Sequence, residues 1–483
     1  MTAEHDGTVE VGYCEGWDPQ RGAALSPIPE HEARARDEAG EPYAVLLSAD
    51  GRPRALFQVS WRDGYLGMFL FDEQGRRTRE FDYRRLAPAR LHLKRYHEVR
   101  HRTDSAAKGE RSDGVEWRFT MDITSDGRAG RVLEYGGSLS MGARVPAEHR
   151  TVARAEFGAW TAYTDARMLG LDRPVTLVAA SAATPERAPE GAPVATGGPA
   201  PEAVPAWSAP RPLAPRHLEA MFTAGSRLAL DSGGIAVIDE PEHAGPLHLP
   251  TGSVLACDPC TLGDSDLPFT VTVPPGDHPL LIARMHWEGK DWGETPAAML
   301  RVLDKPTATW ELAVQSGQDA RLLGTDEFFG FGVDTGTGCF LDAGGRDVLP
   351  GLFEADEVER RGWENGSRAY AAISDPDSGA NLIAYHSGMG DGSYPVWIGR
   401  DADGAVTCFV ADMLLLHRAT ALPPTLASAA VCVPPYAPPA DDDQDQDHNQ
   451  EAPLTDPGAT AAFLSLQSAA LVDFMAERQA QWR

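Results

Sequence analysis

Cysteine is scarce in this sequence. Six cysteines are spread without regular spacing over 483 residues. A disulfide framework needs a dense and regular set of cysteines, so we expect buried free thiols in a reducing compartment. The first residues, MTAEHDGTVEVGY, also lack the basic and then apolar order of a signal peptide. Both observations favour a cytoplasmic protein.

Long apolar runs are missing too. No segment approaches the run of ~18 uninterrupted apolar residues that a membrane-spanning helix requires. Neither a phosphate-binding Walker loop nor a dinucleotide-binding fingerprint occurs in the strand-to-helix context that it needs. We therefore expect no membrane span and no cofactor.

Positive charge is in short supply in the second part of the chain. Residues 1–180 hold 26 Lys/Arg against 28 Asp/Glu, whereas residues 181–483 hold 17 against 43. Nearly all of the net charge of −28 therefore lies after residue 180. Such a field repels nucleic acid and anionic membranes, and it favours a basic protein partner, a cation or simply solubility. We expect a protein partner with a basic surface and no binding to nucleic acid or membranes.

Two proline-rich segments divide the chain. Residues 181–215 are dominated by Pro, Ala and Gly, and residues 434–454 are first proline-rich and then acidic, so neither can bury a core. We expect a linker and a tether there. The predicted order is an N-terminal extension, a β-rich domain, the linker, a second β-rich domain, the tether and a C-terminal amphipathic helix, over residues 1–41, 42–180, 181–215, 216–433, 434–454 and 455–483.

Both large domains consist of short strand candidates. In the first, segments such as YAVLL, RALFQVSW and YLGMFLFD are separated by turn sequences such as SADGR and DEQGR. In the second, the candidates are PFTVTV, HPLLIARMHW, AAMLRVL, TWELAV, FFGFGVD and ANLIAYHS. The predicted fold class is mainly β (β-rich α+β), with two β-sandwich or curved-sheet domains.

The C-terminal helix is expected to start near Asp456, Pro457 and Gly458. Its apolar residues recur at three- and four-residue spacing, so we expect one packing face that docks on the same chain or on a partner. The residues of this face would be Phe463, Leu466, Ala470, Leu471, Phe474 and Met475.

Residues 386–412, HSGMGDGSYPVWIGRDADGAVTCFVAD, combine a glycine-dense turn, two apolar runs and four aspartates. The runs 394–398 and 406–410 predict a hairpin. The glycines around Asp391 let a backbone or a ligand approach closely, so the turn is either a bulged strand entry or a ligand site. The ligand site would comprise His386, Gly388, Gly390, Asp391, Gly392 and Tyr394.

Four segments resemble ordered landmarks of the domain-of-unknown-function 4241 family. They are TGSVLACDP, VPPGDHPLLI, FGVDTGTGCFLD and GMGDGSYP, at residues 251–259, 273–282, 331–342 and 388–395. The resemblance covers about residues 216–433 and implies an uncharacterised bacterial protein, without any catalytic residue to transfer. Met413 stands where the family would have an aromatic residue.

The segment HEVRH matches the H-E-x-x-H arrangement of zinc hydrolases. On a helix, His97 and His101 would share one face and bind zinc, while Glu98 would polarise the bound water. However, no third ligand follows at helical spacing, and RLHLKRYHEVRH also fits a strand, on which the histidines lie too far apart to chelate in that way. We favour the strand and expect no metal.

Each of three further motifs fits either a functional site or an ordinary structural element. Asp334 in FGVDTGTG resembles the catalytic turn of aspartic proteases, which would need Asp231 or a second subunit as partner, but it also fits a glycine turn. Cys257 and Cys260 form one C-x-x-C pair, which Cys339 and Cys408 could complete only by folding close, so we favour buried thiols. The segment DADG at 401–404 is expected to be a turn rather than a calcium loop.

Two hypotheses of function follow. The first is a non-enzymatic binding or interaction protein, for which neutralisation of a toxin or a related conflict-system role is one form. The second is a hydrolase with a carboxylate-based or metal-assisted site around Asp334, Asp391 and Asp412.

Overall fold

The structure is a computed structural model. It describes residues 7–19, 21–102, 114–180, 207–263, 266–290, 292–356, 369–423 and 456–481. The chain divides into two compact units: unit 1 takes Met1–Pro210 and Asp445–Arg483, and unit 2 takes Arg211–Gln444. Both are built mostly of antiparallel strands, which confirms the mainly-β prediction.

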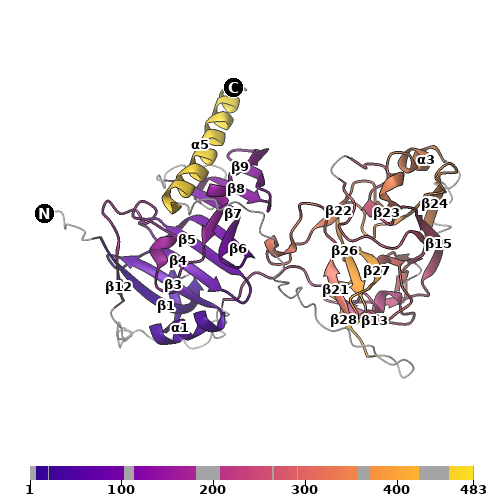
Figure 1. Cartoon of the computed structure of the whole chain (residues 1–483), viewed down its shortest axis with the longest axis horizontal. Coiled ribbons are helices and arrows are strands. Elements are labelled where there is room, and N and C mark those ends of the chain that lie inside the picture. Colours follow the sequence, from indigo (N-terminus) through magenta and orange to yellow (C-terminus); the bar gives the residue numbers. More distant parts are fainter. Residues whose placement is uncertain are drawn as a thin grey trace. The chain divides into compact units, whose positions relative to one another are not determined.

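Unit 1 is built on one 12-stranded sheet (Figure 1). Its order is β10-β9-β8-β7-β6-β5-β4-β3-β1-β12, with β2 paired to β1 and β11 to β7. The strands are β1 Thr8–Asp18, β2 Ala23–Ile28, β3 Tyr43–Ala49, β4 Arg52–Ser60, β5 Tyr65–Phe71, β6 Arg77–Ala87, β7 Arg90–His101, β8 Val115–Ile123, β9 Arg128–Glu134, β10 Ser138–Arg144, β11 Thr151–Ala153 and β12 Thr176–Ala179.

The turns of this sheet follow from the sequence. In SADGR, Asp50 and Gly51 both have positive φ, at 54° and 69°, as a two-residue turn between twisted strands requires. Gly75 in DEQGR and Gly127 in TSDGR also have positive φ, at 76° and 89°. The turn residues therefore set the pairing of successive strands, and most of the sheet is a simple meander.

From Thr8 onwards, the described residues of the predicted N-terminal extension belong to this unit and not to an extension. Among residues 1–41, predicted as an N-terminal extension, the structure places β1, β2 and the helix α1 (Glu30–Ala39). Strand β1 pairs with β3 and β12, and Val9 and Val11 are buried in the core. Glutamates and glycines alternate with its apolar residues, so only one face of β1 carries the apolar signal of a strand.

Helices cover one face of the sheet in unit 1. They are α1, α2 (Ala147–Arg150), the 3-10 turn η1 (Trp160–Ala162) and the C-terminal helix α5 (Pro457–Gln481). Ala461, Leu464 and Leu471 of α5 are buried in the core of this face. The helix therefore docks on its own chain, and in Figure 1 its C-terminal turns extend beyond the strands that it crosses.

The packing face of α5 contains only some of the predicted residues: Leu471 is buried, and Phe463 and Met475 pack against the core of unit 1. Leu466 is 68% exposed and Phe474 is 39% exposed, and Ala470 is exposed as well. Polar residues take part in the docking instead: Ser468 Oγ donates to Glu98 Oε2 over 2.7 Å, and Ser465 Oγ lies 3.2 Å from the Tyr96 hydroxyl. The apolar residues of α5 occur all round the helix, so their spacing did not single out one face.

By length and composition alone, α5 could cross a membrane. Within Pro457–Ala476, a window of 18 residues has a mean hydropathy of 1.4, and 28% of that window is buried. Ser and Gln residues interrupt its apolar runs, which is why the count of uninterrupted residues did not select it. Helices of protein cores meet the same criterion, so this finding alone assigns no membrane to the chain.

The described residues of unit 2 form three sheets, ordered β15-β17-β20-β27-β26-β21 with β22 on β26, β16-β23-β25-β24, and β19-β18-β14-β13-β28. Its helical elements are η2 Ala220–Phe222, η3 Ala320–Leu322, η4 Ala343–Gly345 and α3 Leu349–Ala355. The strands are β13 Arg227–Leu230, β14 Gly234–Ile238, β15 Glu242–Leu249, β16 Val254–Cys257, β17 Gly276–Ile282, β18 Met285–Trp287, β19 Gly293–Glu294, β20 Ala297–Arg301, β21 Thr309–Leu312, β22 Gly330–Val333, β23 Thr337–Asp342, β24 Tyr370–Ser374, β25 Asn381–His386, β26 Gly392–Arg400, β27 Val406–Asp412 and β28 Thr420–Ala421.

The seven-stranded sheet lies between the other two. Ile398 and Phe409 point into a core shared with the four-stranded sheet, whereas Trp397 and Val410 point into a core shared with the five-stranded sheet. Strands β26 and β27 are thus buried on both faces, which is why they read as continuous apolar runs. Helix α3 covers the outer face of the four-stranded sheet with Leu349 and Phe353.

The predicted hairpin is present, since β26 pairs with β27 from Val396/Ala411 to Arg400/Val406. The predicted strand PFTVTV is wrong. Within it, the backbone N–H groups of Phe269 and Val273 bond to the carbonyls of Val254 and Gly252, whereas that of Thr270 bonds to the carbonyl of Val314 in another part of the chain. Prolines flank the segment on both sides, so it makes isolated bonds and no ladder.

Part of the predicted linker is packed. Trp207 packs against Tyr65 of unit 1 with tilted rings, whose centroids are 5.7 Å apart, and Leu213 N–H donates to Glu327 O in unit 2 over 3.0 Å. Residues 181–206 of the linker and the tether over 434–454 lie outside the described residues.

Candidate functional site

A buried carboxylate shapes the turn that carries Asp334. Asp258, which directly follows β16, is 2% exposed. Its Oδ2 accepts hydrogen bonds from the backbone N–H groups of Asp334 (3.0 Å) and Thr335 (2.8 Å), and the Thr335 hydroxyl donates to it as well (2.8 Å). The turn between β22 and β23 is therefore fixed by a side chain from another strand. Asp334 itself is exposed.

The glycine-rich turn lies directly against this first turn. Gly336 N–H donates to Asp391 Oδ1 over 3.1 Å, and Ser387 N–H donates to Gly336 O over 3.1 Å. We call residues 334–336 and 387–391 together the twin-turn surface. Two of the predicted candidates, Asp334 and Asp391, thus lie on neighbouring turns, and both are exposed. Met389 on the same surface is 80% exposed.

Two more hydrogen bonds close the glycine-rich turn. Ser387 Oγ and the Tyr394 hydroxyl both donate to Gly390 O, over 2.8 and 2.7 Å. Burial raises the pKa of Tyr394, and the negative charge of Asp391 raises it further, while the hydrogen bond with Ser387 lowers it. Tyr394 is therefore a neutral hydrogen-bond donor of the turn.

The glycine at 388 is needed for close packing. Its φ is +63°, and a Cβ at this position would lie 3.1 Å from Met413 Cβ. This crowding, with the positive φ, accounts for the glycine without a ligand. Of the remaining predicted residues, His386 ends β25 and is half-buried, while Gly392 begins β26 and is exposed.

Asp412 does not join this surface. It is 2% exposed, and its Oδ1 accepts a hydrogen bond from Leu414 N–H over 2.9 Å. Burial raises the pKa of Asp412 to about 6, and the Leu414 bond and the nearby Trp397 indole partly offset this rise. The indole Nε1 and Asp412 Oδ2 make no hydrogen bond of standard geometry. The predicted set of three carboxylates is therefore divided between the surface and the core.

The proposed partner of Asp334 within the chain lies elsewhere. Asp231 occupies the turn between β13 and β14 of the five-stranded sheet. Asp334 lies beside β23 of the four-stranded sheet, on the other side of the central sheet. An aspartic-protease pair needs two carboxylates that share a proton, so these two residues do not form one.

The HEVRH segment is a strand, as favoured from the sequence. His97 Nδ1 lies 2.9 Å from Thr120 Oγ1, and His101 Nε2 lies 3.0 Å from Arg77 O. Glu98 accepts hydrogen bonds from Tyr96 and from Ser468 of α5. Burial lowers the pKa of His97. The three residues hold the sheet and α5 together and do not converge on one point.

The cysteines pair in an unforeseen combination. Cys257 and Cys339 lie opposite each other on β16 and β23, with their sulfurs 3.5 Å apart and no disulfide. Both are buried, whereas Cys260 is exposed, and burial raises the pKa of Cys339 well above its usual value. Cys408 belongs to another core. Among the described residues, no group of three or more His, Cys, Asp or Glu could hold a metal ion.

The DADG segment is a turn. Asp401 Oδ1 accepts from the N–H groups of Asp403 (3.0 Å) and Ala405 (2.9 Å), and its Oδ2 pairs with Lys305 Nζ at 2.6 Å. Its carboxylate is thus used within the hairpin.

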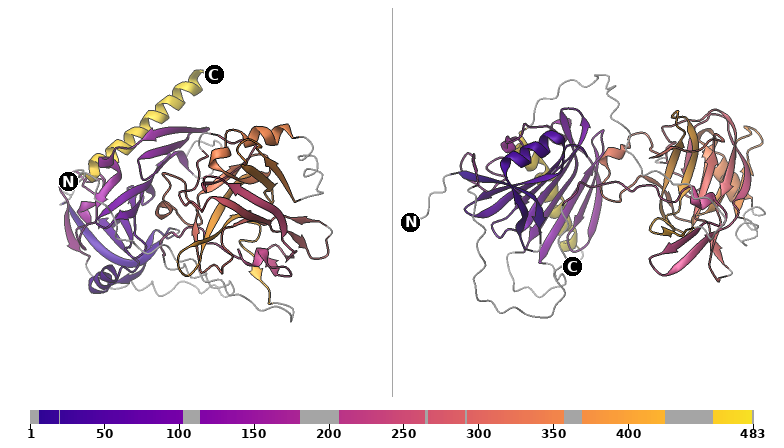
Figure 2. Two further views of the ribbon diagram at one scale, coloured as in Figure 1. Left: turned by 45° about the vertical axis from the view of Figure 1, so that its right-hand side comes forward. Right: turned by 90° about the horizontal axis from the view of Figure 1, so that it is seen from below.

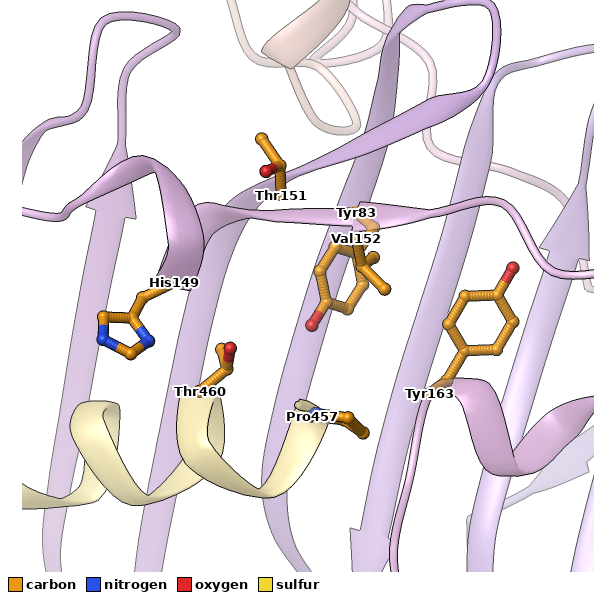
Figure 3. A pocket seen from close by; sticks show the side chains of 7 residues that line it. All are labelled: Tyr83, His149, Thr151, Val152, Tyr163, Pro457 and Thr460. Carbon is orange, nitrogen blue, oxygen red and sulfur yellow. The ribbon is translucent and has the colours of Figure 1, made fainter. Parts of the chain in front are cut away.

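A small cavity lies under the first turn of α5 in unit 1 (Figure 3). It has a volume of about 10 Å³, which is near the minimum for one water molecule. The close-up shows Pro457 and Thr460 of α5 facing side chains of the sheet and of α2. The lining residues are Tyr83, His149, Thr151, Val152, Tyr163, Pro457 and Thr460. A metabolite does not fit in such a space, so this cavity is a packing feature.

Three of the four predicted landmarks contain or adjoin β16, β23 and β26, and the second, which contains β17, meets the first where Val273 N–H donates to Gly252 O. A comparison with known families tests the resemblance. Residues 247–411 match the family described as "Protein of unknown function (DUF4241)". The predicted resemblance is confirmed. The DUF4241 match contains all four landmarks and ends one residue before Asp412, so Met413 lies outside it. No curated protein and no solved structure matches the chain.

Sequence reasoning missed Asp258, the residue that organises the DUF4241 landmarks. It lies in the first landmark, TGSVLACDP, and binds the turn of the third. The signal was an aspartate between the end of an apolar strand and a proline. Such a residue reads equally well as an ordinary turn, because sequence alone does not show which backbone amides its carboxylate will reach.

Proposed function

We propose that this protein is a non-enzymatic binding protein that recognises a basic protein partner through the twin-turn surface of unit 2. The observation that carries the proposal is the joining of two family landmarks into one exposed surface with Asp334, Asp391 and Met389. Carboxylates that flank an exposed methionine offer charge to a basic side chain and an adaptable apolar contact to its aliphatic part.

The charge of unit 2 supports a basic partner. Residues 211–423 hold 31 Asp/Glu and 14 Lys/Arg. A field of one sign speeds the approach of an oppositely charged protein and suppresses the binding of acidic ones. Neutralisation of a basic toxin is one form that this function could take. A reducing cytoplasm would suit the Cys257 and Cys339 thiols, which remain unbonded at 3.5 Å.

The alternative of a hydrolase around Asp334, Asp391 and Asp412 lacks a supporting observation. The buried Asp412 makes its hydrogen bond to Leu414, and Asp391 bonds to the backbone of the neighbouring turn. A carboxylate site needs groups that face one substrate atom together. Binding is the simpler use of two exposed carboxylates on rigid turns.

The test is a pull-down with the full-length chain from extracts of its source cells, followed by titration of any enriched protein. The double variant Asp334→Asn/Met389→Ser should lose a basic partner that the unchanged chain enriches, with affinity reduced at least about tenfold. The matched control is Asp304→Asn/Val348→Ser, which makes the same changes at exposed residues elsewhere in unit 2. Equal capture by both double variants, or no enrichment over an acidic control protein, would contradict the proposal.

A further inference from the structure

The 12-stranded sheet of unit 1 has a bare edge at β10. Among the described strands, the pairing order ends at β10, which pairs only with β9. Its residues Ser138–Ala143 carry no charge, and most of them are exposed. Proteins usually protect such an edge with charged residues, proline or a bulge, because an unprotected edge pairs with another strand.

The hydrogen bonds show which groups β10 turns outward. Tyr135 N–H donates to Gly137 O, so the pairs Leu133/Leu139 and Arg131/Met141 exchange the ladder bonds. Ser138, Ser140 and Gly142 therefore direct their backbone groups away from β9. Gly142 O accepts one bond from the Arg131 guanidinium over 3.1 Å, which leaves this carbonyl a second lone pair.

Helix α5 adds an exposed apolar surface beside this edge. The Arg131 guanidinium also donates to Gln467 of α5 over 2.6 Å, and Met475 Cε would lie 3.8 Å from a Cβ at Gly137, so the helix lies against the β9–β10 hairpin. Leu466 is 68% exposed and Met141 on β10 is 41% exposed. Residues Pro457–Val472 contain no charged side chain. Figure 2 shows α5 beside the strands of unit 1 in two further views.

We propose that β10 pairs antiparallel with β10 of a second copy of this chain, so that two unit 1 sheets join into one. In a chain with net charge −28, a second copy meets least repulsion at a surface without charge, which residues 138–143 of β10 and residues 457–472 of α5 provide. Only Arg144, at the end of β10, is charged. An edge strand can meet its own copy across a two-fold axis, because antiparallel pairing is self-complementary.

The register follows from the outward groups. Ser140 pairs with Ser140 of the partner subunit, and Ser138 pairs with Gly142 of the partner subunit, so that the outward N–H and C=O groups meet. Met141 then faces Leu139 of the partner subunit on the face that carries α5. The exposed Met141 side chain is buried by this pairing, and both α5 helices lie on one face of the joined sheet.

Sedimentation equilibrium of the full chain over a range of concentrations tests the proposal. The unchanged chain should form a dimer of twice 51.9 kDa. Ser140→Pro removes an outward N–H without breaking a bond to β9, and it should raise the dissociation constant about tenfold or more. Met141→Lys should do the same, because it places a charged side chain against Leu139 of the partner subunit. Val348→Lys, at a similarly exposed residue of unit 2, should leave the dimer unchanged.

Circular dichroism shows whether each variant keeps its strand content, and Met141→Lys provides a second test should Ser140→Pro unfold. The proposal would be overturned if the unchanged chain stayed monomeric at the highest protein concentration measured. It would also be overturned if both variants formed dimers as readily as the unchanged chain. Flotation with neutral phosphatidylcholine vesicles tests a lipid surface as the other occupant of this face. If a monomeric chain bound the vesicles and Leu466→Glu abolished this binding, the occupant of this face would be lipid and not a second copy.

Discussion

Single residues in this protein show how burial decides the role of a carboxylate. Asp258, Asp391 and Asp412 all lie next to the end of a strand of unit 2, and nothing in the sequence indicates which of them is buried. Asp258 is buried but accepts several backbone and hydroxyl hydrogen bonds, which replace its lost water. Asp412 is equally buried and has one such bond, and its pKa is raised to about 6. Burial without compensation makes Asp412 a cost to folding at neutral pH.

The stability of unit 2 should therefore depend on pH through Asp412. Below about pH 3 the carboxyl is protonated in both the folded and the unfolded chain, and it costs nothing. As the pH rises to about 6 and beyond, the unfolded chain ionises first, and the free energy of unfolding falls by about 2 to 3 kcal/mol. Asp412→Asn removes this ionisation. The free energy of unfolding of the variant, relative to the unchanged chain, should rise by that amount between pH 4 and pH 7.5.

Urea unfolding at several pH values measures this difference. An effect of the buried amide that is the same at every pH cancels when the values at pH 4 and pH 7.5 are compared. Asp304→Asn is the matched control, because the Asp304 side chain is 99% exposed and stays in water in both states. A constant difference between Asp412→Asn and the unchanged chain at all pH values would show that Asp412 ionises freely.

At the scale of whole elements, α5 is a helix with two apolar sides. Leu464 is fully buried in the core of unit 1, while Leu466, two residues later, is 68% exposed. The helix has few charged residues to distinguish these sides, so packing on the sheet decides which one is buried. Replacing the buried leucine and the exposed leucine in the same way shows how much each side of α5 contributes to the stability of unit 1.

Leu464→Ala should lower the free energy of unfolding of unit 1 by about 2 to 4 kcal/mol, because it leaves a cavity in a closely packed core. Leu466→Ala should change it by less than about 0.5 kcal/mol, as expected for an exposed residue. Thermal unfolding followed by circular dichroism measures both. Equal effects of the two substitutions would mean that α5 does not pack on unit 1 with the face described.

Elements also show how far the sequence determines this fold. The strands β3, β4, β5, β26 and β27 could be predicted because their apolar runs end at turns such as Asp50-Gly51, whose backbone has positive φ. Strand β1 and the exposed side of α5 could not, since their apolar residues are too sparse or too evenly spread to mark a face. For PFTVTV, strand composition was outweighed by the prolines at 268 and 274, and the segment makes single backbone bonds instead of a ladder.

The candidate site was predictable in part for the same reason. Glycines at 388 and 390 marked the turn, and Asp391 was named as its carboxylate. That Asp258 would hold the Asp334 turn, and that Asp412 would face the core, depends on contacts between strands far apart in the chain. Spacing along one strand does not contain this information.

At the scale of the whole molecule, the two units differ more in charge than in architecture. Each has its own hydrophobic cores and is built on antiparallel strands. However, residues 1–180 hold nearly equal numbers of acidic and basic residues, whereas residues 211–423 hold 31 acidic and 14 basic ones. Unit 2 therefore folds against its own negative charge, and unit 1 has numerous ion pairs between neighbouring strands, such as Arg95–Asp122.

Salt should consequently act on the two units in opposite ways. Between 0.02 and 0.5 M NaCl, the Debye length falls from roughly 20 Å to roughly 4 Å, so repulsion among the carboxylates of unit 2 is screened. The melting temperature of unit 2 should rise by about 2 to 4 °C, the shift that about 1 kcal/mol gives in a domain of this size. That of unit 1 should stay constant or fall slightly, because its surface ion pairs are weakened. Calorimetry of the full chain follows both transitions, and the pH-dependent variant Asp412→Asn assigns one of them to unit 2. If both transitions moved together with salt, the uneven charge would have no separate effect on the stability of unit 2, and its excess of carboxylates would be better explained by recognition of a basic partner alone.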